Sequence, residues 1–236
     1  DFGVGVEKAA FVAGHSLGEY SALASAGAIS LADTARLLKL RGQAMQRAVP
    51  VGEGAMASLI GPKSDVALAE AAAAAGAEVG VCVVANDNNA GNVVISGAKA
   101  AVDRAIEKAK ELGARAIPLN VSAPFHCPLM QPAADEMAAA LADAAISAPR
   151  APVVANVTAR PTNDPEAVRR LLVEQVTGRV RWRESVEWLT GEGGVTRFAE
   201  AGAGKVLAGM VKRIAPDAEA VSLNAPADLE AFAKSL

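Results

Sequence analysis

Cysteine, histidine and aromatic residues are scarce in this sequence of 236 residues, which contains two cysteines, two histidines and 3% aromatic residues. Cys82 and Cys127 lie far apart and belong to no Cys/His ligand pattern. Because a zinc site requires such a pattern, we expect no metal site and two buried, reduced thiols. The scarcity of histidine limits any search for a general base to His15 and His126.

Long apolar runs and clusters of basic residues are also missing. No run is long enough to span a membrane, and no basic segment followed by an apolar one opens the sequence, which starts at Asp1. The 23 Lys and Arg are scattered among 26 Asp and Glu, which gives a formal net charge of -3. We therefore expect a cytoplasmic protein with no membrane association and no nucleic-acid partner.

What the sequence does contain is apolar material, 52% of all residues, patterned as alternating strands and helices. This alternation predicts an α/β fold with a large, mainly parallel sheet covered on both faces. Residues 54–119 instead predict strand, helix, strand, strand, helix and strand, which is typical of a ferredoxin-like unit. We expect a large domain of residues 1–52 and 120–236, interrupted by a small domain of residues 53–119.

The expected elements outside that unit are assigned from periodicity and from capping and breaking residues. The helices are predicted over residues 17–27, 31–48, 130–144, 165–176, 182–189 and 206–214, and the strands over residues 9–13, 153–156, 195–199 and 221–223.

Residues 14–18, Gly-His-Ser-Leu-Gly, lie between the first of these strands and the first helix. Strand, Gly-x-Ser-x-Gly turn and helix form the pattern of a nucleophile elbow, in which the serine hydroxyl is exposed on a strained turn. We expect the two glycines to serve the turn by removing side chains that would collide there. Ser16 is therefore a candidate nucleophile, and the alternative is a glycine-rich turn whose serine only caps the helix.

Arg41 lies among apolar residues on the predicted helix 31–48, with Leu37 and Leu38 one turn before it and Ala44 and Met45 one turn after it. A guanidinium that leaves a buried face needs an anion, because an unpaired buried charge is strongly destabilising. The anion is either an internal Asp or Glu or the carboxylate of a ligand, held by two hydrogen bonds.

His126 lies in a loop of residues 120–128 that contains Pro124 and Pro128. It is a better candidate for the general base than His15, because a sharp turn directs the side chains next to the serine away from it. The alternative is a structural histidine.

Two further segments are rich in turn-forming residues. Residues 86–92, Asn-Asp-Asn-Asn-Ala-Gly-Asn, predict a hairpin connection, with a role in lining the site as the alternative and Asn86 as the candidate. Residues 202–205, Gly-Ala-Gly-Lys, do not form a phosphate loop, because Ala199 and Val206 stand where glycine and Ser or Thr are required. We expect no nucleotide and no other cofactor.

Together these segments resemble the malonyl-CoA:acyl carrier protein transacylase family, the acyltransferases that supply fatty acid synthesis. The similar stretches occur in the family's order: GHSLGEYSAL (14–23), LRGQAMQRAVP (40–50), VVISG (93–97), VSAPFHCPLM (121–130), EQVTGRVRWRESV (174–186) and GAGKVLAGMVKRI (202–214). They cover the chain from end to end.

The resemblance implies a role for each of the residues singled out above. Ser16 is acylated, His126 is its base, and Arg41 binds the free carboxylate of malonate. A main-chain carbonyl at Gln175 orients the base in place of an aspartate. Phe125 narrows the pocket against a methyl branch, which favours malonyl over methylmalonyl groups.

The resemblance also implies the partners, malonyl-CoA and acyl carrier protein. The backbone N–H of Leu17 stabilises the negative oxygen of the intermediate, and His15 and Asn86 complete the substrate-binding set. The candidate basic residues for docking the acidic carrier are Lys212, Arg213 and Arg181, and the alternative is that each is only a solvated surface charge.

The sequence departs from the family pattern at its start, where similar proteins have a strand and a Gly-Gln-Gly loop that completes the oxyanion hole. We therefore also consider a fragment completed by a separate chain, or a carrier-binding protein that is not catalytically competent. A serine esterase or thioesterase is the other alternative. Milder departures are Ala90, Asn92 and Ala203, which replace family Pro, Gln and Pro.

Overall fold

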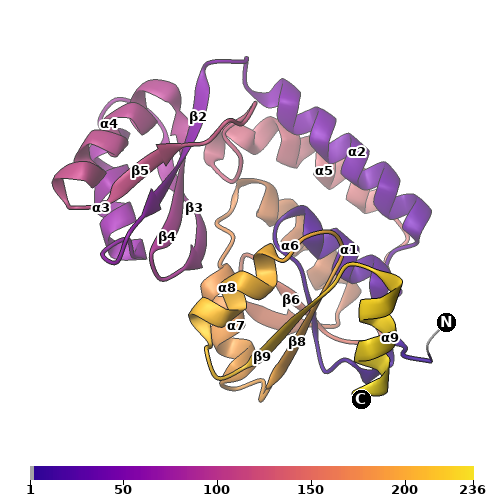
Figure 1. Ribbon diagram of the computed structural model, residues 1–236. Helices are drawn as coiled ribbons and strands as arrows, with labels where there is room; N and C mark the ends of the chain where they lie inside the picture. Colours follow the sequence, from indigo (N-terminus) through magenta and orange to yellow (C-terminus); the bar gives the residue numbers. More distant parts are fainter. Residues whose placement is uncertain (1–2) are drawn as a thin grey trace.

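Two groups of helices and strands, each with its own apolar core, make up the structure (Figure 1). The computed structural model describes residues 3–236, so residues 1 and 2 of the expected large domain lie outside the described part. The combination of sheets and covering helices confirms the mixed α/β class.

The smaller group contains four strands and two helices. Its elements are β2 (Gly54–Ile60), α3 (Val66–Ala77), β3 (Cys82–Asn89), β4 (Asn92–Ala98), α4 (Lys99–Glu111) and β5 (Arg115–Pro118). The strands pair antiparallel in the order β3-β4-β2-β5. The helices α3 and α4 lie side by side, and they approach closely at Gly76, where an added Cβ would lie 2.4 Å from the carbonyl oxygen of Ala101. Small residues on both helices permit this packing.

The hairpin between β3 and β4 is shorter than the sequence predicts. Only Ala90 and Gly91 separate the two strands, and Gly91 has a φ of 88°. Residues 86–89 continue β3 and are buried. The prediction of a turn over residues 86–92 is wrong in extent, because distant groups satisfy these polar side chains: His15 contacts Asn88, and Arg183 contacts Asp87.

The larger group contains the remaining elements. They are the 3-10 helices η1 (Val6–Lys8) and η2 (Pro128–Met130), the strands β1 (Val12–Ala13), β6 (Val153–Ala155), β7 (Arg160–Thr162), β8 (Arg197–Ala201) and β9 (Glu219–Leu223), and the helices α1 (Leu17–Ser25), α2 (Leu31–Ala48), α5 (Gln131–Asp143), α6 (Pro165–Thr177), α7 (Trp182–Thr190), α8 (Val206–Ile214) and α9 (Pro226–Lys234).

The sheets of this group are small. β1 pairs parallel with β6, β6 pairs antiparallel with β7, and β8 pairs parallel with β9 in a separate sheet. The sequence did not predict β7, which has three residues, or α9. A strand as short as β7 leaves too little alternation to be recognised from sequence.

The longest helix, α2, confirms its predicted start and end. The Ser30 hydroxyl accepts a hydrogen bond from the N–H of Asp33 at 3.0 Å, and the helix stops at Ala48, before Pro50. α2 lies beside α5 (Figure 1), and Met45, Met137 and other apolar side chains fill the core between the helices. This packing places Arg41 on the buried face of α2.

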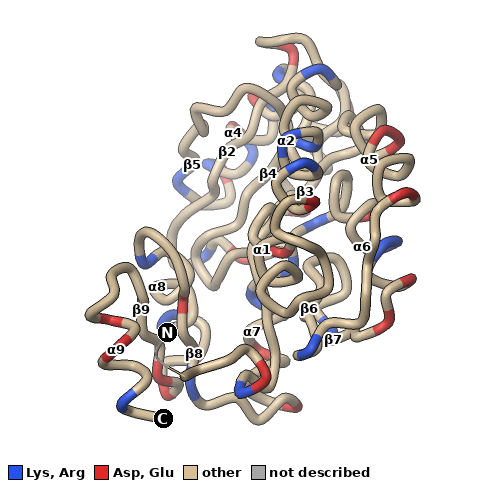
Figure 2. Tube along the Cα trace, turned by 90° about the vertical axis from the view of Figure 1, so that its right-hand side faces the viewer, with Lys and Arg blue, Asp and Glu red and all other residues tan. Residues whose placement is uncertain are grey.

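Within residues 3–236, no helix is both long and apolar enough to cross a membrane. Basic and acidic residues are interspersed along the trace (Figure 2). Cys82 and Cys127 are free and buried, and burial raises the pKa of the Cys82 thiol to about 11. No cluster of three or more His, Cys, Asp or Glu suited to a metal ion occurs in the described part of the chain.

Candidate active site

Ser16 lies at the turn between β1 and α1 with φ 54° and ψ -112°, a backbone conformation that L-residues rarely adopt. Gly14 permits the turn, since an added Cβ would lie 2.0 Å from the backbone carbonyl of Gly18. At Gly18 an added Cβ would meet nothing within 4 Å. The expectation that both glycines prevent collisions is therefore wrong for Gly18. The tight contact is made by the backbone of Gly18, which lies against Gly14.

Asn156 holds both sides of this turn, and the sequence did not single it out. Its Oδ1 accepts the N–H of Ser16 at 2.7 Å, and its Nδ2 donates to the carbonyl of Gly14 at 2.7 Å. The parallel pairing of β1 with β6 brings Asn156 there, one residue beyond the end of β6. Its amide thus provides hydrogen-bond partners for two backbone groups that the strained turn leaves without regular ones.

His126 faces Ser16 across the fold, with Nε2 2.8 Å from the serine Oγ. Its Nδ1 lies 2.9 Å from the backbone carbonyl oxygen of Gln175. Because a carbonyl can only accept, Nδ1 carries the proton and Nε2 presents a lone pair to the serine hydroxyl. Like Ser16, His126 has a positive φ, 57°.

Burial, and then the positive charge of Arg41, lower the pKa of His126 to about 3. The imidazole is therefore neutral at physiological pH and can accept a proton. The hydrogen bond to Gln175 opposes this shift but is outweighed.

Arg41 reaches the same serine. Its Nη2 donates to the Oγ of Ser16 at 3.1 Å and to Oε1 of Gln175 at 3.1 Å. The residue is only 6% exposed, and its guanidinium lies 6.0 Å from the centroid of the Tyr20 ring. Among the ion pairs of residues 3–236 none includes Arg41, and its Nε has no hydrogen-bond partner there. Glu19 acts on this charge electrostatically without forming an ion pair with it. A buried cation without a direct carboxylate contact favours a ligand carboxylate over a structural ion pair.

Glu19 lies beneath the serine and was not predicted as a site residue. It is 2% exposed, and its Oε2 accepts from Nε2 of Gln175 at 2.8 Å and from the N–H of Asn156 at 3.0 Å. Burial raises its pKa to about 7, although both hydrogen bonds and the charge of Arg41 oppose the shift. Its place in the Gly-His-Ser-Leu-Gly-Glu stretch gives no signal that the side chain is buried.

The remaining predicted site residues lie around this group at different distances. Leu17 is the first residue of α1, so its N–H has no acceptor within the helix, and its side chain is exposed. Phe125 is half-buried between two cores. His15 is turned toward Asn88, with its Nε2 2.8 Å from the Asn88 Oδ1. Asn86 joins the larger group through a backbone bridge to Val180.

Asn86 forms no hydrogen bond with Ser16, His126 or Arg41 among the described residues. The structure thus brings together the serine, the histidine, the arginine and Gln175, whereas Asn86 pairs with the backbone of Val180.

The N-terminus of α8 also excludes a phosphate loop at residues 202–205. The carboxylate of Glu200 accepts the N–H groups of Leu207 and Ala208 at 3.1 and 2.8 Å, so an acidic side chain already occupies this helix end. Of the docking candidates, Lys212 and Arg213 are exposed on α8, whereas Arg181 pairs with Glu184.

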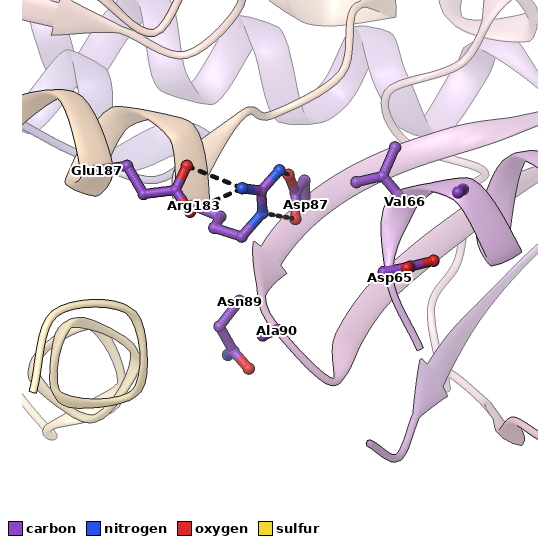
Figure 3. Close-up of a pocket in the computed structure, with 8 residues that line it drawn as sticks. Asp65, Val66, Asp87, Asn89, Ala90, Arg183 and Glu187 are labelled. Carbon is purple, nitrogen blue, oxygen red and sulfur yellow. Dashed lines mark hydrogen bonds and ion pairs between the residues drawn. The ribbon is translucent and has the colours of Figure 1, made fainter. Parts of the chain in front are cut away.

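A separate cavity of about 390 Å³ lies between β3, the start of α3 and α7 (Figure 3), and Ser16 does not line it. In it Arg183 lies between Asp87 and Glu187, at 2.8 and 2.7 Å from their carboxylates. The arginine is therefore neutralised by this protein's own side chains.

The model of the acyl transferase domain family matches residues 3–224. The chain belongs to this family. Among curated acyl transferases it is 48% identical, over 94% of its own length and 71% of the relative's, to "Malonyl CoA-acyl carrier protein transacylase" of Salmonella typhimurium. The resemblance to the transacylase family found in the sequence is thereby confirmed.

Solved acyl transferase structures show the same similarity. An acyl-carrier-protein-S-malonyltransferase from Bartonella henselae is 52% identical with a TM-score of 0.95, covering 99% of this chain and 74% of that one. A malonyl-transacylase in complex with a type II PKS acyl-carrier protein is 44% identical with a TM-score of 0.92, covering 96% and 73%. These relatives support a transferase and give no support to an esterase.

Proposed function

We propose that this acyl transferase moves a malonyl group from malonyl-CoA to the phosphopantetheine thiol of acyl carrier protein, through a malonyl ester on Ser16. One observation carries the proposal. The serine hydroxyl that faces His126 also faces Arg41, a buried cation without an acidic ion-pair partner in the described chain. A substrate with both a thioester and a free carboxylate fits this arrangement.

In the first half of the proposed reaction, Nε2 of His126 accepts the hydroxyl proton of Ser16 as the serine oxygen attacks the thioester carbonyl. The N–H of Leu17 donates to the developing oxyanion. Collapse of the intermediate breaks the carbon–sulfur bond, and the imidazolium returns the proton to the CoA sulfur. The carrier thiol reverses these steps, so the serine ester is cleaved and the malonyl thioester forms again.

Arg41 also couples substrate recognition to base strength in this mechanism. Its charge lowers the pKa of His126 in the free protein. A malonyl carboxylate bound to Arg41 neutralises that charge and therefore raises the basicity of His126. A correct substrate thus strengthens its own general base.

We also infer the domain organisation from the two cores. Residues 53–119 form an inserted ferredoxin-like domain, which the strand order β3-β4-β2-β5 and the separate core of this segment support. Residues 1–52 and 120–236 form the catalytic domain. Phe125, next to His126, narrows the acyl pocket, and His15 and Asn86 line its approach from opposite sides of the domain boundary.

The carrier protein is proposed to dock beside α8, where Lys212 and Arg213 are exposed. The related transacylase in complex with an acyl-carrier protein supports a carrier partner of this kind. Arg181 is a weaker docking candidate, because Glu184 already neutralises it.

The direct test is incubation with malonyl-CoA followed by mass spectrometry of the peptide that contains Ser16. The proposal predicts a malonyl adduct on Ser16, its loss in Ser16→Ala, and transfer to holo acyl carrier protein on addition of the carrier. Release of free malonate as the main product would favour an esterase. No adduct would favour a carrier-binding protein without catalytic activity.

A further inference from the structure

Gln175 occupies a central position beneath the serine, because its side-chain amide contacts groups of opposite charge on its two sides. Its Oε1 accepts from Arg41 at 3.1 Å, and its Nε2 donates to Glu19 at 2.8 Å and to the carbonyl of Ser16 at 3.0 Å. Its own backbone carbonyl orients His126. The residue is fully buried, so no water competes for these contacts.

Only one orientation of this amide satisfies both charged neighbours. A guanidinium can only donate and an ionised carboxylate can only accept, so the amide oxygen must face Arg41 and the amide nitrogen must face Glu19. Rotating the amide by half a turn would set oxygen against carboxylate and nitrogen against guanidinium. Both contacts would then be repulsive in a buried site, where electrostatic interactions are strong.

We propose that ionised Glu19 is a positioning residue for substrate selection: it fixes the amide of Gln175, which in turn holds the guanidinium of Arg41 where a substrate carboxylate must bind. The inference rests on the proposed function and extends it to a residue that touches no reacting atom. Without the carboxylate, the amide nitrogen keeps the carbonyl of Ser16 as an acceptor but loses its charged one, so the amide holds Arg41 less firmly. Recognition of malonyl then weakens, whereas the contact of Ser16 with His126 remains.

Two charged or titratable groups act on Glu19: Arg41 from α2, and Tyr20 from α1, the helix of Glu19 itself. His126, from the loop before η2, acts with Arg41 on the same site. Burial raises the pKa of Tyr20 well above its ordinary value and lowers that of His126 to about 3, so neither changes charge near neutrality. Glu19, with a pKa of about 7, is the group that does.

The test compares transfer of malonyl and acetyl groups by Glu19→Gln, since acetyl lacks the carboxylate that Arg41 binds. Glu174→Gln is the matched control, because Glu174 is the residue before Gln175 and is half-exposed. Glutamine keeps an oxygen that accepts from Nε2 of Gln175 but removes the charge, so a charge-assisted hydrogen bond becomes a neutral one. The malonyl-to-acetyl ratio of kcat/KM should therefore fall by about tenfold in Glu19→Gln, with acetyl transfer changed by less than about threefold. The control keeps the ratio of the unsubstituted protein.

A second measurement needs no variant, so it tests the role of Glu19 even if Glu19→Gln does not fold. In the unsubstituted protein the malonyl-to-acetyl ratio should fall as the pH is lowered from about 8 to about 6, as Glu19 is protonated. An equal loss of both activities in a folded Glu19→Gln, or a ratio that does not change with pH, would overturn the inference. Absence of malonyl transfer by the unsubstituted protein would overturn the proposed function itself.

Discussion

Nδ1 of His126 donates to the backbone carbonyl of Gln175 at 2.9 Å, so a neutral group orients the candidate base. Serine hydrolases with a triad use a carboxylate at this place, which stabilises the imidazolium that forms. Here the buried acid of the site, Glu19, contacts the side chain of Gln175 instead. The imidazolium must therefore be stabilised by something else, and a carboxylate on the substrate is suited to this because it neutralises Arg41.

The first prediction concerns Arg41. In Arg41→Ala, malonyl transfer should fall by about a hundredfold or more, since a bidentate charge-assisted contact is lost, whereas acetyl transfer should be retained or increased. The increase is expected because removal of the nearby positive charge raises the pKa of His126. Steady-state kinetics with both thioesters measures this. Arg36→Ala, on the exposed face of the same helix, is the control, and equal loss of both activities would show that Arg41 is structural.

The second prediction separates the two glycines of the elbow. Gly14→Ala places a Cβ 2.0 Å from the backbone of Gly18 and should destabilise the fold by more than about 3 kcal/mol. Gly18→Ala has free space in the first turn of α1 and should raise stability by about 0.5–1 kcal/mol. Chemical denaturation of both variants checks the pair. A similar destabilisation in both would contradict the close approach seen here.

The third prediction concerns the contact of β3 with α7. Asp87 is almost fully buried against Arg183, whereas Glu187, the other partner of that arginine, is about half-exposed. Asp87→Ala should therefore lower the free energy of unfolding by about 2–3 kcal/mol, and Glu187→Ala by less than about 1 kcal/mol. Thermal and denaturant unfolding measure the difference. Equal effects would mean that burial of Asp87 adds nothing to the pair.

The fourth prediction concerns pH and stability at Glu19. Its pKa is about 7 in the fold and near 4.5 when unfolded, so the folded state binds more protons between these values. The stabilising contribution of Glu19 to the free energy of unfolding is therefore present below about pH 4.5 and is lost as the pH rises through about 7. Relative to the unsubstituted protein, Glu19→Gln should be more stable at pH 8 than at pH 5, by roughly 3 kcal/mol. A difference in melting temperature that is independent of pH would contradict the raised pKa.

Local sequence patterns predicted most elements because their signals lie within one turn or one strand. The capping of Asp33 by Ser30 starts α2, and Pro50 follows its end. The same local rules failed at residues 86–89, where asparagine and aspartate predict a turn but extend a buried strand. Contacts with His15 and Arg183, far away in sequence, outweigh the local preference.

The sequence by itself determined the α/β class, and it predicted the elbow serine, His126 as the better base candidate of two histidines, and the position of Arg41 on an apolar helix face. These features depend on spacing along the chain. Only the tertiary structure decided that Glu19, Asn156 and the side chain of Gln175 form one hydrogen-bonded group beneath the serine. Burial and hydrogen-bond geometry between segments more than a hundred residues apart depend on packing, which no local pattern encodes.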